Sequence, residues 1–256
     1  MVHFVGAGPG APDLITLRGK KLLEEADVII YAGSLVNPAL LSYAKESCEI
    51  YDSSRLNLEE VIEITKKADS DSKTIVRLHT GDPCLYGAIR EQMDELDKLK
   101  IAYDVTPGVS SFCGAAAALN MEYTLPGITQ SVIITRIDGR TPVPESEKVE
   151  ELSKHGATMV FFLSAGDAEG LKRRLIDSGV PGDTPCGVVY KATWEDEDKL
   201  TCKLSELPER MAEHGIKKTA LIIVGNAVAQ SGYEKSRLYA ADFTTGYRKG
   251  TDAKED

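Results

Sequence analysis

Three short motifs rich in glycine and proline stand where apolar stretches of the chain end. They are Gly6-Ala7-Gly8-Pro9-Gly10, Thr80-Gly81-Asp82-Pro83 and Thr106-Pro107-Gly108-Val109-Ser110-Ser111. Glycines let the backbone approach a small molecule closely, while Asp82 and the two serines can supply directed hydrogen bonds. Because β-branched and apolar residues precede each motif, we expect three turns at the carboxyl edge of one parallel sheet, where open α/β sheets bind ligands.

The first motif formally fits the dinucleotide-binding fingerprint, with Ala11 in its last position. A nicotinamide-binding unit also has an acidic residue at the end of its second strand, whereas residues 28–31 run into Ala32-Gly33-Ser34. Pro9 and Pro12 further remove amide donors that a pyrophosphate would use. Taken alone, the motif is at least as well interpreted as a tight structural loop.

Two further segments could contact a ligand. Residues 84–87 place an apolar wall beside the Asp82 carboxylate, which suits a ligand with a cationic amino-acid end and a flat ring. The loop 135–144 carries Arg136 and Arg140, and guanidinium groups bind carboxylates well, although a solvated linker is the simpler interpretation of this loop by itself. The four histidines are scattered without metal-ligand spacing, so we assign no protein-bound metal.

Composition narrows the classes of function. The chain of 256 residues has 30 basic and 40 acidic residues and a formal net charge of -10, which disfavours a nucleic-acid partner. No apolar run approaches the roughly 20 residues that span a bilayer, so we expect no membrane segment. The five cysteines form no Cys-x-x-Cys pair and strand signals begin directly after Met1, so we expect a cytoplasmic protein with reduced cysteines.

Strand and helix signals alternate along the whole chain, which predicts two α/β domains with a cleft between them. The turn-like residues 123–127 mark the boundary, so we expect an N-terminal α/β domain over 1–124 and a C-terminal α/β domain over 125–245. The charged residues 246–256 are expected to form a disordered tail. The expected strands are residues 2–5, 28–31, 49–51, 74–78, a segment near Tyr103, 131–135, 158–163, 186–190, 199–203 and 219–224.

In this order, the motifs resemble those of the tetrapyrrole methylases of corrin and siroheme synthesis, over roughly residues 2–245. Residues 5–10, Asp13-Leu14-Ile15-Thr16, Gly81-Asp82-Pro83 and 107–111 carry this resemblance. Within the family, the chain is similar to the enzymes that methylate C-11 of precorrin-4 or cobalt-precorrin-4. The segments that carry this closer similarity are residues 31–36, 85–87, 110–115, 134–136 and 139–142.

The resemblance implies S-adenosylmethionine as methyl donor and a polycarboxylate tetrapyrrole as substrate, bound between two domains of a protein that is usually a homodimer. Asp82 and Glu91 would then assist a later proton loss, and Arg136, Arg140 and Arg18 would hold substrate carboxylates. Relatives that act on uroporphyrinogen have an arginine where this chain has Ala88, so that role is not transferred. The implied cofactor-binding residues are Pro9, Thr80, Gly81, Asp82, Leu85, Ser110, Ser111, Leu163, Ala192 and Ala220, of which the last three lie in looser motifs.

The expected reaction needs little from acid or base groups. The sulfonium methyl group is already activated, so the protein mainly aligns sulfur, methyl and C-11 and excludes water. Three alternatives stay open at this point: a methylase of the same fold acting at another tetrapyrrole carbon, a noncatalytic tetrapyrrole carrier, and a nicotinamide oxidoreductase. The sequence has no evident ligand that would distinguish a cobalt-bearing macrocycle from a metal-free one.

Overall fold

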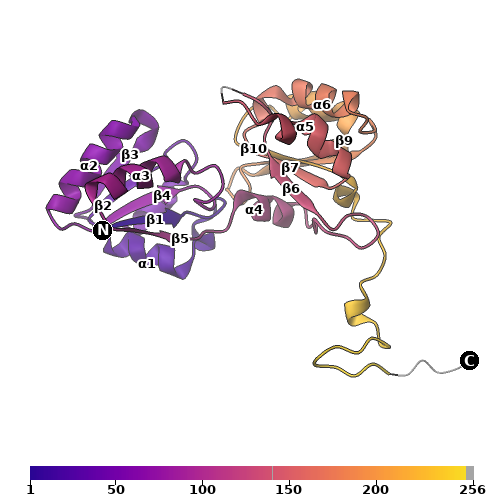
Figure 1. Ribbon diagram of the computed structural model, residues 1–256, viewed down its shortest axis with the longest axis horizontal. Helices are drawn as coiled ribbons and strands as arrows, with labels where there is room; N and C mark the ends of the chain where they lie inside the picture. The colour runs from indigo at the N-terminus through magenta and orange to yellow at the C-terminus, as the bar shows by residue number, and fades with distance from the viewer. Residues whose placement is uncertain (140, 252–256) are drawn as a thin grey trace, which may run out of the picture. The chain divides into compact units, whose positions relative to one another are not determined.

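The computed structural model describes residues 1–139 and 141–251 and divides into two units (Figure 1). Unit 1 comprises residues 1–120, 188–200 and 211–221, and unit 2 comprises the remaining described residues. The chain forms two five-stranded sheets with helices packed against them, which confirms the expected α/β fold class. No helix in the described part of the chain is long and apolar enough to cross a membrane.

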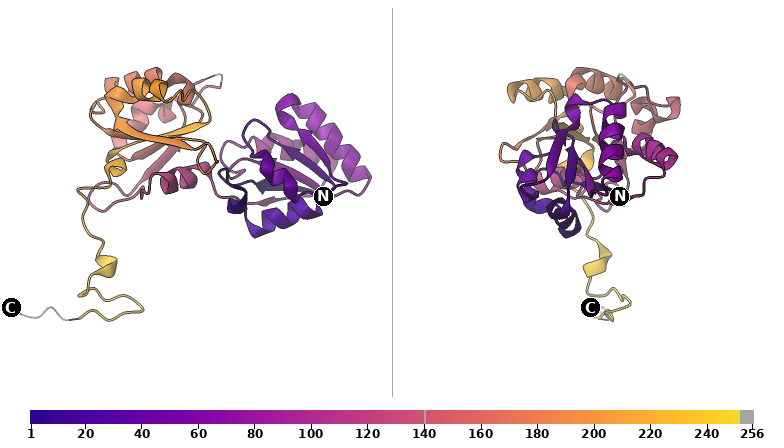
Figure 2. Two further views of the ribbon diagram at one scale, coloured as in Figure 1. Left: turned by 180° about the vertical axis from the view of Figure 1, so that it is seen from behind. Right: turned by 90° about the vertical axis from the view of Figure 1, so that its left-hand side faces the viewer.

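The first sheet has the strand order β3-β2-β4-β1-β5, and every pair of neighbours is parallel. Helix α1 covers one face, and α2 and α3 cover the other (Figure 2). Helix α4 follows β5 after a short loop. The bounds are β1 Val2–Gly6, α1 Leu17–Glu25, β2 Val28–Tyr31, β3 Glu49–Asp52, α2 Leu58–Ser70, β4 Ile75–His79, α3 Ile89–Leu99, β5 Tyr103–Thr106 and α4 Ser111–Ala118.

The second sheet has the order β6-β7-β10-β8-β9 and is mixed, because β7 pairs parallel with β6 and antiparallel with β10. Its strands and those of the first sheet begin and end within two residues of the predicted positions wherever a range was predicted. The bounds are β6 Val132–Thr135, α5 Val149–Leu152, β7 Thr158–Phe161, α6 Ala168–Asp177, β8 Pro185–Tyr190, β9 Asp198–Lys203, α7 Leu207–Glu213 and β10 Ala220–Val224.

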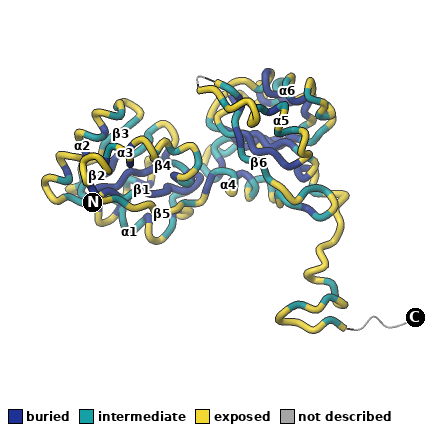
Figure 3. The backbone as a smooth tube through the Cα atoms, in the orientation of Figure 1, coloured by how far each residue is buried: buried dark blue, intermediate teal, exposed yellow. Residues whose placement is uncertain are grey.

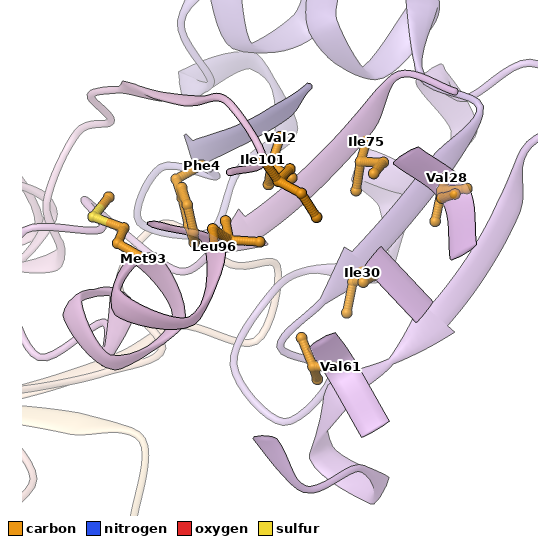
Figure 4. Close-up of a cluster of buried hydrophobic side chains, with 10 residues drawn as sticks. Val2, Phe4, Val28, Ile30, Val61, Ile75, Met93, Leu96 and Ile101 are labelled. Atoms are coloured by element: carbon orange, nitrogen blue, oxygen red, sulfur yellow. The ribbon is translucent and has the colours of Figure 1, made fainter. Parts of the chain in front are cut away.

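Side chains alternate between the two faces of the first sheet, and the central strands β1, β2 and β4 are buried on both faces by the helices that cover them. Phe4 and Ile30 belong to the cluster on the α2 and α3 face, where Leu96 lies near Phe4 and Val61 lies near Ile30 (Figure 4). Val5 and Ile29 belong to the separate cluster on the α1 face. Figure 3 shows buried residues concentrated in the central strands of the first sheet, whereas its edge strands β3 and β5 and the surrounding loops carry exposed residues. The two clusters fix the positions of the strands, and so of the strand ends from which the loops of the candidate site begin.

Helix α3 offers a direct test of this core. Leu96 is 1% exposed and packs in the cluster of Figure 4, whereas Leu99 on the same helix is 39% exposed. We expect Leu96→Ala to lower the free energy of unfolding by about 2 to 5 kcal/mol, because it leaves a cavity in a packed core. The matched Leu99→Ala should change it by about 0.5 kcal/mol or less. Urea denaturation measures both, and equal effects would contradict the packing described.

Candidate functional site

The three glycine motifs leave three neighbouring strands. Since β4, β1 and β5 are adjacent and parallel, their carboxyl ends meet at one edge of the sheet. The loops after β1 and β4 are joined directly: the Gly8 amide donates to the Gly81 carbonyl at 3.2 Å, and the Gly81 amide donates to the Gly8 carbonyl at 2.8 Å. The predicted convergence of the three turns is therefore confirmed.

The loops approach so closely that side chains would keep them apart. A Cβ atom on Gly108 would lie 2.1 Å from the carbonyl oxygen of Gly81 and 2.8 Å from Cα of Gly6. A Cβ atom on Gly6 would lie 2.5 Å from Cα of Gly108. These neighbours are backbone atoms, which cannot rotate away as the end of a side chain can. Glycine at both positions is thus a condition for the loops to touch.

Asp82 ties the second loop to the third. Its Oδ2 accepts a hydrogen bond from the Gly108 amide at 2.9 Å, and its Oδ1 accepts one from the Cys84 amide at 2.8 Å. Burial acts to raise the pKa of Asp82, but these bonds and one with the Cys84 thiol outweigh it and hold the pKa below its usual value. Asp82 is therefore an ionised carboxylate with both oxygens engaged, which makes it a weak base.

The same contact brings in the start of α4. A Cβ atom on Gly81 would lie 3.2 Å from both the amide nitrogen and the hydroxyl of Ser111. Ser110, the residue before α4, is buried, and its hydroxyl does not cap the helix. The structure thus gathers Gly81, Asp82, Ser110 and Ser111 at one place, with Thr80 directly before them on the chain.

Pro9 lies against the segment that carries Ala192. A Cβ atom on Gly114 would lie 2.7 Å from Cβ of Pro9 and 3.4 Å from Cβ of Ala192, so the three residues are neighbours. The Ala11 amide also donates to the hydroxyl of Thr193 at 2.9 Å. Both contacts lie within unit 1. The structure therefore brings together Pro9 and Ala192, two cofactor-binding residues that separate motifs implied.

Three residues beside Ala192 and Ala220 have left-handed backbone conformations. The φ angles of Lys191, Thr193 and Thr219 are 45°, 69° and 55°. Such angles are uncommon outside glycine and costly for a β-branched residue, so tertiary contacts must impose them, and they concentrate at ligand-binding sites. One such contact is the hydrogen bond from the Lys191 amide to the Thr219 carbonyl at 2.9 Å. No residue pattern in the sequence indicated these conformations.

The remaining predicted residues are distributed over both units. Leu163 follows β7 in unit 2, has a φ of 54° and is 70% exposed. Arg136, also in unit 2, donates to the carbonyls of Thr141 at 2.8 Å and Pro142 at 3.0 Å, so its guanidinium shapes its own loop. Arg18 is exposed in the first turn of α1. Arg140 lies outside the residues that the structure describes.

A cavity of about 250 Å³ opens next to the second loop, entirely within unit 1. Thr80 and Leu85 line it, as does Glu91, which is exposed in the first turn of α3. Arg77 and His79 of β4 also line it, although the sequence analysis assigned neither a role. A predicted acidic residue and two predicted cofactor-binding residues thus share one hollow with two buried basic side chains.

Comparisons with known proteins identify the family of the chain. The family model described as Tetrapyrrole (Corrin/Porphyrin) Methylases matches residues 1–208. A cobalt-precorrin-4 C(11)-methyltransferase of Methanocaldococcus jannaschii is 52% identical over 248 residues, which cover 97% of this chain and 96% of that protein.

Solved structures give the same result. The X-ray structure of the cobalamin biosynthetic enzyme cobalt precorrin-4 methyltransferase, CbiF, is 44% identical, with a TM-score of 0.86 over 89% of this chain and 95% of that one. The uroporphyrin-III C-methyltransferase of Thermus thermophilus, complexed with S-adenosyl homocysteine, is 25% identical, with a TM-score of 0.75 over 90% and 99%. The chain therefore belongs to the tetrapyrrole (corrin/porphyrin) methylases, as its motifs predicted.

Proposed function

We propose that this chain transfers a methyl group from S-adenosylmethionine to C-11 of cobalt-precorrin-4 or precorrin-4 in cobalamin biosynthesis. The observation that carries the proposal is the meeting of three glycine loops at one edge of the first sheet. The chain is also 52% identical to a cobalt-precorrin-4 C(11)-methyltransferase over nearly the full length of both proteins. Membership of the methylase family argues against a nicotinamide oxidoreductase. Identity that high favours C-11 over another carbon of the macrocycle.

The donor site that we propose is built around the touching loops. Glycines at the loop contacts let the three loops pack against one another, and the Asp82 carboxylate holds two of them in place. S-adenosylmethionine supplies the activated methyl group when it is bound. The proposed binding residues are Pro9, Thr80, Gly81, Asp82, Leu85, Ser110 and Ser111, with Leu163, Ala192 and Ala220 from the looser motifs.

The protein's part in the reaction is to orient the reactants and exclude water, since proximity and alignment lower the barrier to transfer onto an electron-rich carbon. Asp82 and Glu91 remain our candidates for assisting the later proton loss. Asp82 is the weaker base, because its oxygens already accept hydrogen bonds that lower its pKa. Glu91 is exposed and lines the cavity beside Thr80, which supports it as the proton acceptor.

The substrate bears many carboxylates, so we assign Arg136, Arg18 and Arg140 to holding them through charge-assisted hydrogen bonds. Only part of the Arg136 fork is used by its own loop, which leaves N–H donors for a ligand. On the resemblance to the family, we also propose that the protein is cytoplasmic and forms a homodimer. We place the boundary between its two domains between residues 124 and 125.

Transfer of a labelled methyl group tests the proposed function. The purified chain is incubated with S-adenosylmethionine carrying a ¹³C methyl group and with either cobalt-precorrin-4 or precorrin-4, and the product is examined by NMR. We expect one labelled methyl group at C-11, and inhibition by excess S-adenosylhomocysteine. Label at another carbon would indicate a different methylase of the same fold. Macrocycle binding with no transfer in either metal form would indicate a carrier.

The contribution of Asp82 to the free energy of unfolding should depend on pH. Its pKa is lowered in the folded protein, so its stabilising effect is present above the unfolded pKa of about 3.9 and is lost as pH falls through the folded value. We expect Asp82→Asn to reduce the free energy of unfolding at neutral pH by about 1 kcal/mol, a charged hydrogen bond discounted for partial exposure.

Urea denaturation of both proteins between about pH 7 and pH 3 measures this difference, which should shrink toward zero at the acidic end. A cost that is the same at every pH would show that the ionised carboxylate does not stabilise the loops.

A further inference from the structure

Strand β4 directs two basic side chains into the interior of unit 1. Arg77 and His79 are two residues apart and therefore lie on the same face of the sheet, the one covered by α2 and α3. Arg77 is 8% exposed and His79 is 4% exposed, and both line the cavity of about 250 Å³ beside the second loop. Polar groups buried this deeply need hydrogen-bond or charge partners. The partners that Arg77 and His79 lack therefore indicate which ligand the cavity could bind.

Arg77 has hydrogen bonds but no counter-ion. Its Nε donates to Oε1 of Gln92 at 3.0 Å, and its Nη1 donates to the carbonyl of Ile30 at 3.0 Å. Among residues 1–139 and 141–251, no ion pair joins it to a carboxylate, and burial is the cause of its pKa shift. Burial lowers the pKa of Arg77 to about 10, so it stays charged at neutral pH. An unpaired buried charge is costly, and an anion in the cavity would relieve that cost.

His79 adds an unused hydrogen-bonding atom. Its Nε2 is buried and has no hydrogen-bond partner in the described part of the chain. Burial, helped by the charge of Arg77, lowers the pKa of His79 to about 3, so the imidazole is neutral at neutral pH. A neutral imidazole with its proton on Nε2 is a hydrogen-bond donor and carries no charge to be desolvated. Arg77 and His79 together therefore offer donors, which a carboxylate needs.

We propose that this cavity receives one carboxylate side chain of the tetrapyrrole substrate, with Arg77 binding it through charge-assisted hydrogen bonds and His79 donating from Nε2. The inference rests on the proposed function, which provides a substrate with many carboxylates. Apolar neighbours such as Leu56 and Val61 also line the cavity and suit the methylene groups of such a side chain. Glu91 lines it as well, but is exposed to solvent.

The position of the cavity gives this subsite a role in specificity. Thr80 and Leu85 belong to the proposed donor site and also form part of the cavity wall. A side chain anchored at Arg77 would fix the macrocycle in rotation next to the methyl donor. Arg77 and His79 thus bind a peripheral side chain of the substrate and do not contact the reacting atoms.

Steady-state kinetics with cobalt-precorrin-4 test the subsite in the full chain. In Arg77→Met, we expect the substrate KM to rise by about tenfold or more, the loss of one charge-assisted hydrogen bond. In His79→Phe, it should rise by about threefold or more. In both variants kcat and the Kd of S-adenosylhomocysteine, measured by calorimetry, should stay within about threefold of wild type. The control Lys66→Met removes one positive charge from the exposed side of α2 and should leave every constant unchanged.

The variant His79→Phe keeps the test decisive if Arg77→Met fails to fold. It removes an atom that has no hydrogen-bond partner, so the midpoint of its urea denaturation should equal that of wild type. An unchanged KM in His79→Phe, or in a folded Arg77→Met, with an active wild type would overturn this inference alone. A wild type that binds neither S-adenosylhomocysteine nor the macrocycle would overturn the proposed function, and this inference with it.

Discussion

The loops after β1, β4 and β5 touch through backbone atoms because Gly6, Gly81 and Gly108 have no side chains to separate them. The parallel order β4-β1-β5 brings the three strand ends together, and the glycines let the loops close the last few ångströms. Asp82 can accept from the Gly108 amide only when the loops are this close. The position of Ser110 and Ser111 depends on the same contact, since they follow the third loop.

Burial of cationic side chains in unit 1 explains how an acidic chain could bind an anionic substrate. The chain as a whole is acidic, with a formal net charge of -10, yet its proposed substrate is an anion with many carboxylates. Such a substrate can be bound if cations are placed in a low-dielectric interior, where an ion pair is stronger than on the surface. Arg77 has that position and is held there by Gln92 and Ile30. The net charge thus argues against a nucleic-acid partner without excluding a small polyanion.

Much of this arrangement could be predicted from the sequence, because strands and turns depend on local residue types. Runs of β-branched residues located the strands, and the glycine motifs located the three loops. The family was confirmed by the comparisons. The roles of individual site residues, the division at residue 124 and the homodimer stay predictions.

Other features depend on tertiary contacts that residue patterns do not report. The left-handed conformation of Thr193 accompanies a hydrogen bond from Ala11, which is 182 residues away in the chain. Arg77 sits in an ordinary strand pattern, and only the packed structure shows that it is buried without a counter-ion. Asp82 could be predicted as a site residue, but its hydrogen bonds and lowered pKa are properties of the folded loops.

The central claim is that backbone contact between the glycine loops creates the donor site. Calorimetric titration of S-adenosylhomocysteine into wild type, Gly108→Ala and Gly182→Ala tests it most directly, since a Cβ atom at Gly182 would make only an ordinary contact of 3.5 Å. We predict that Gly108→Ala, if folded by circular dichroism, binds at least about tenfold more weakly than wild type, and that Gly182→Ala binds as wild type does. Unchanged affinity in a folded Gly108→Ala would contradict the account.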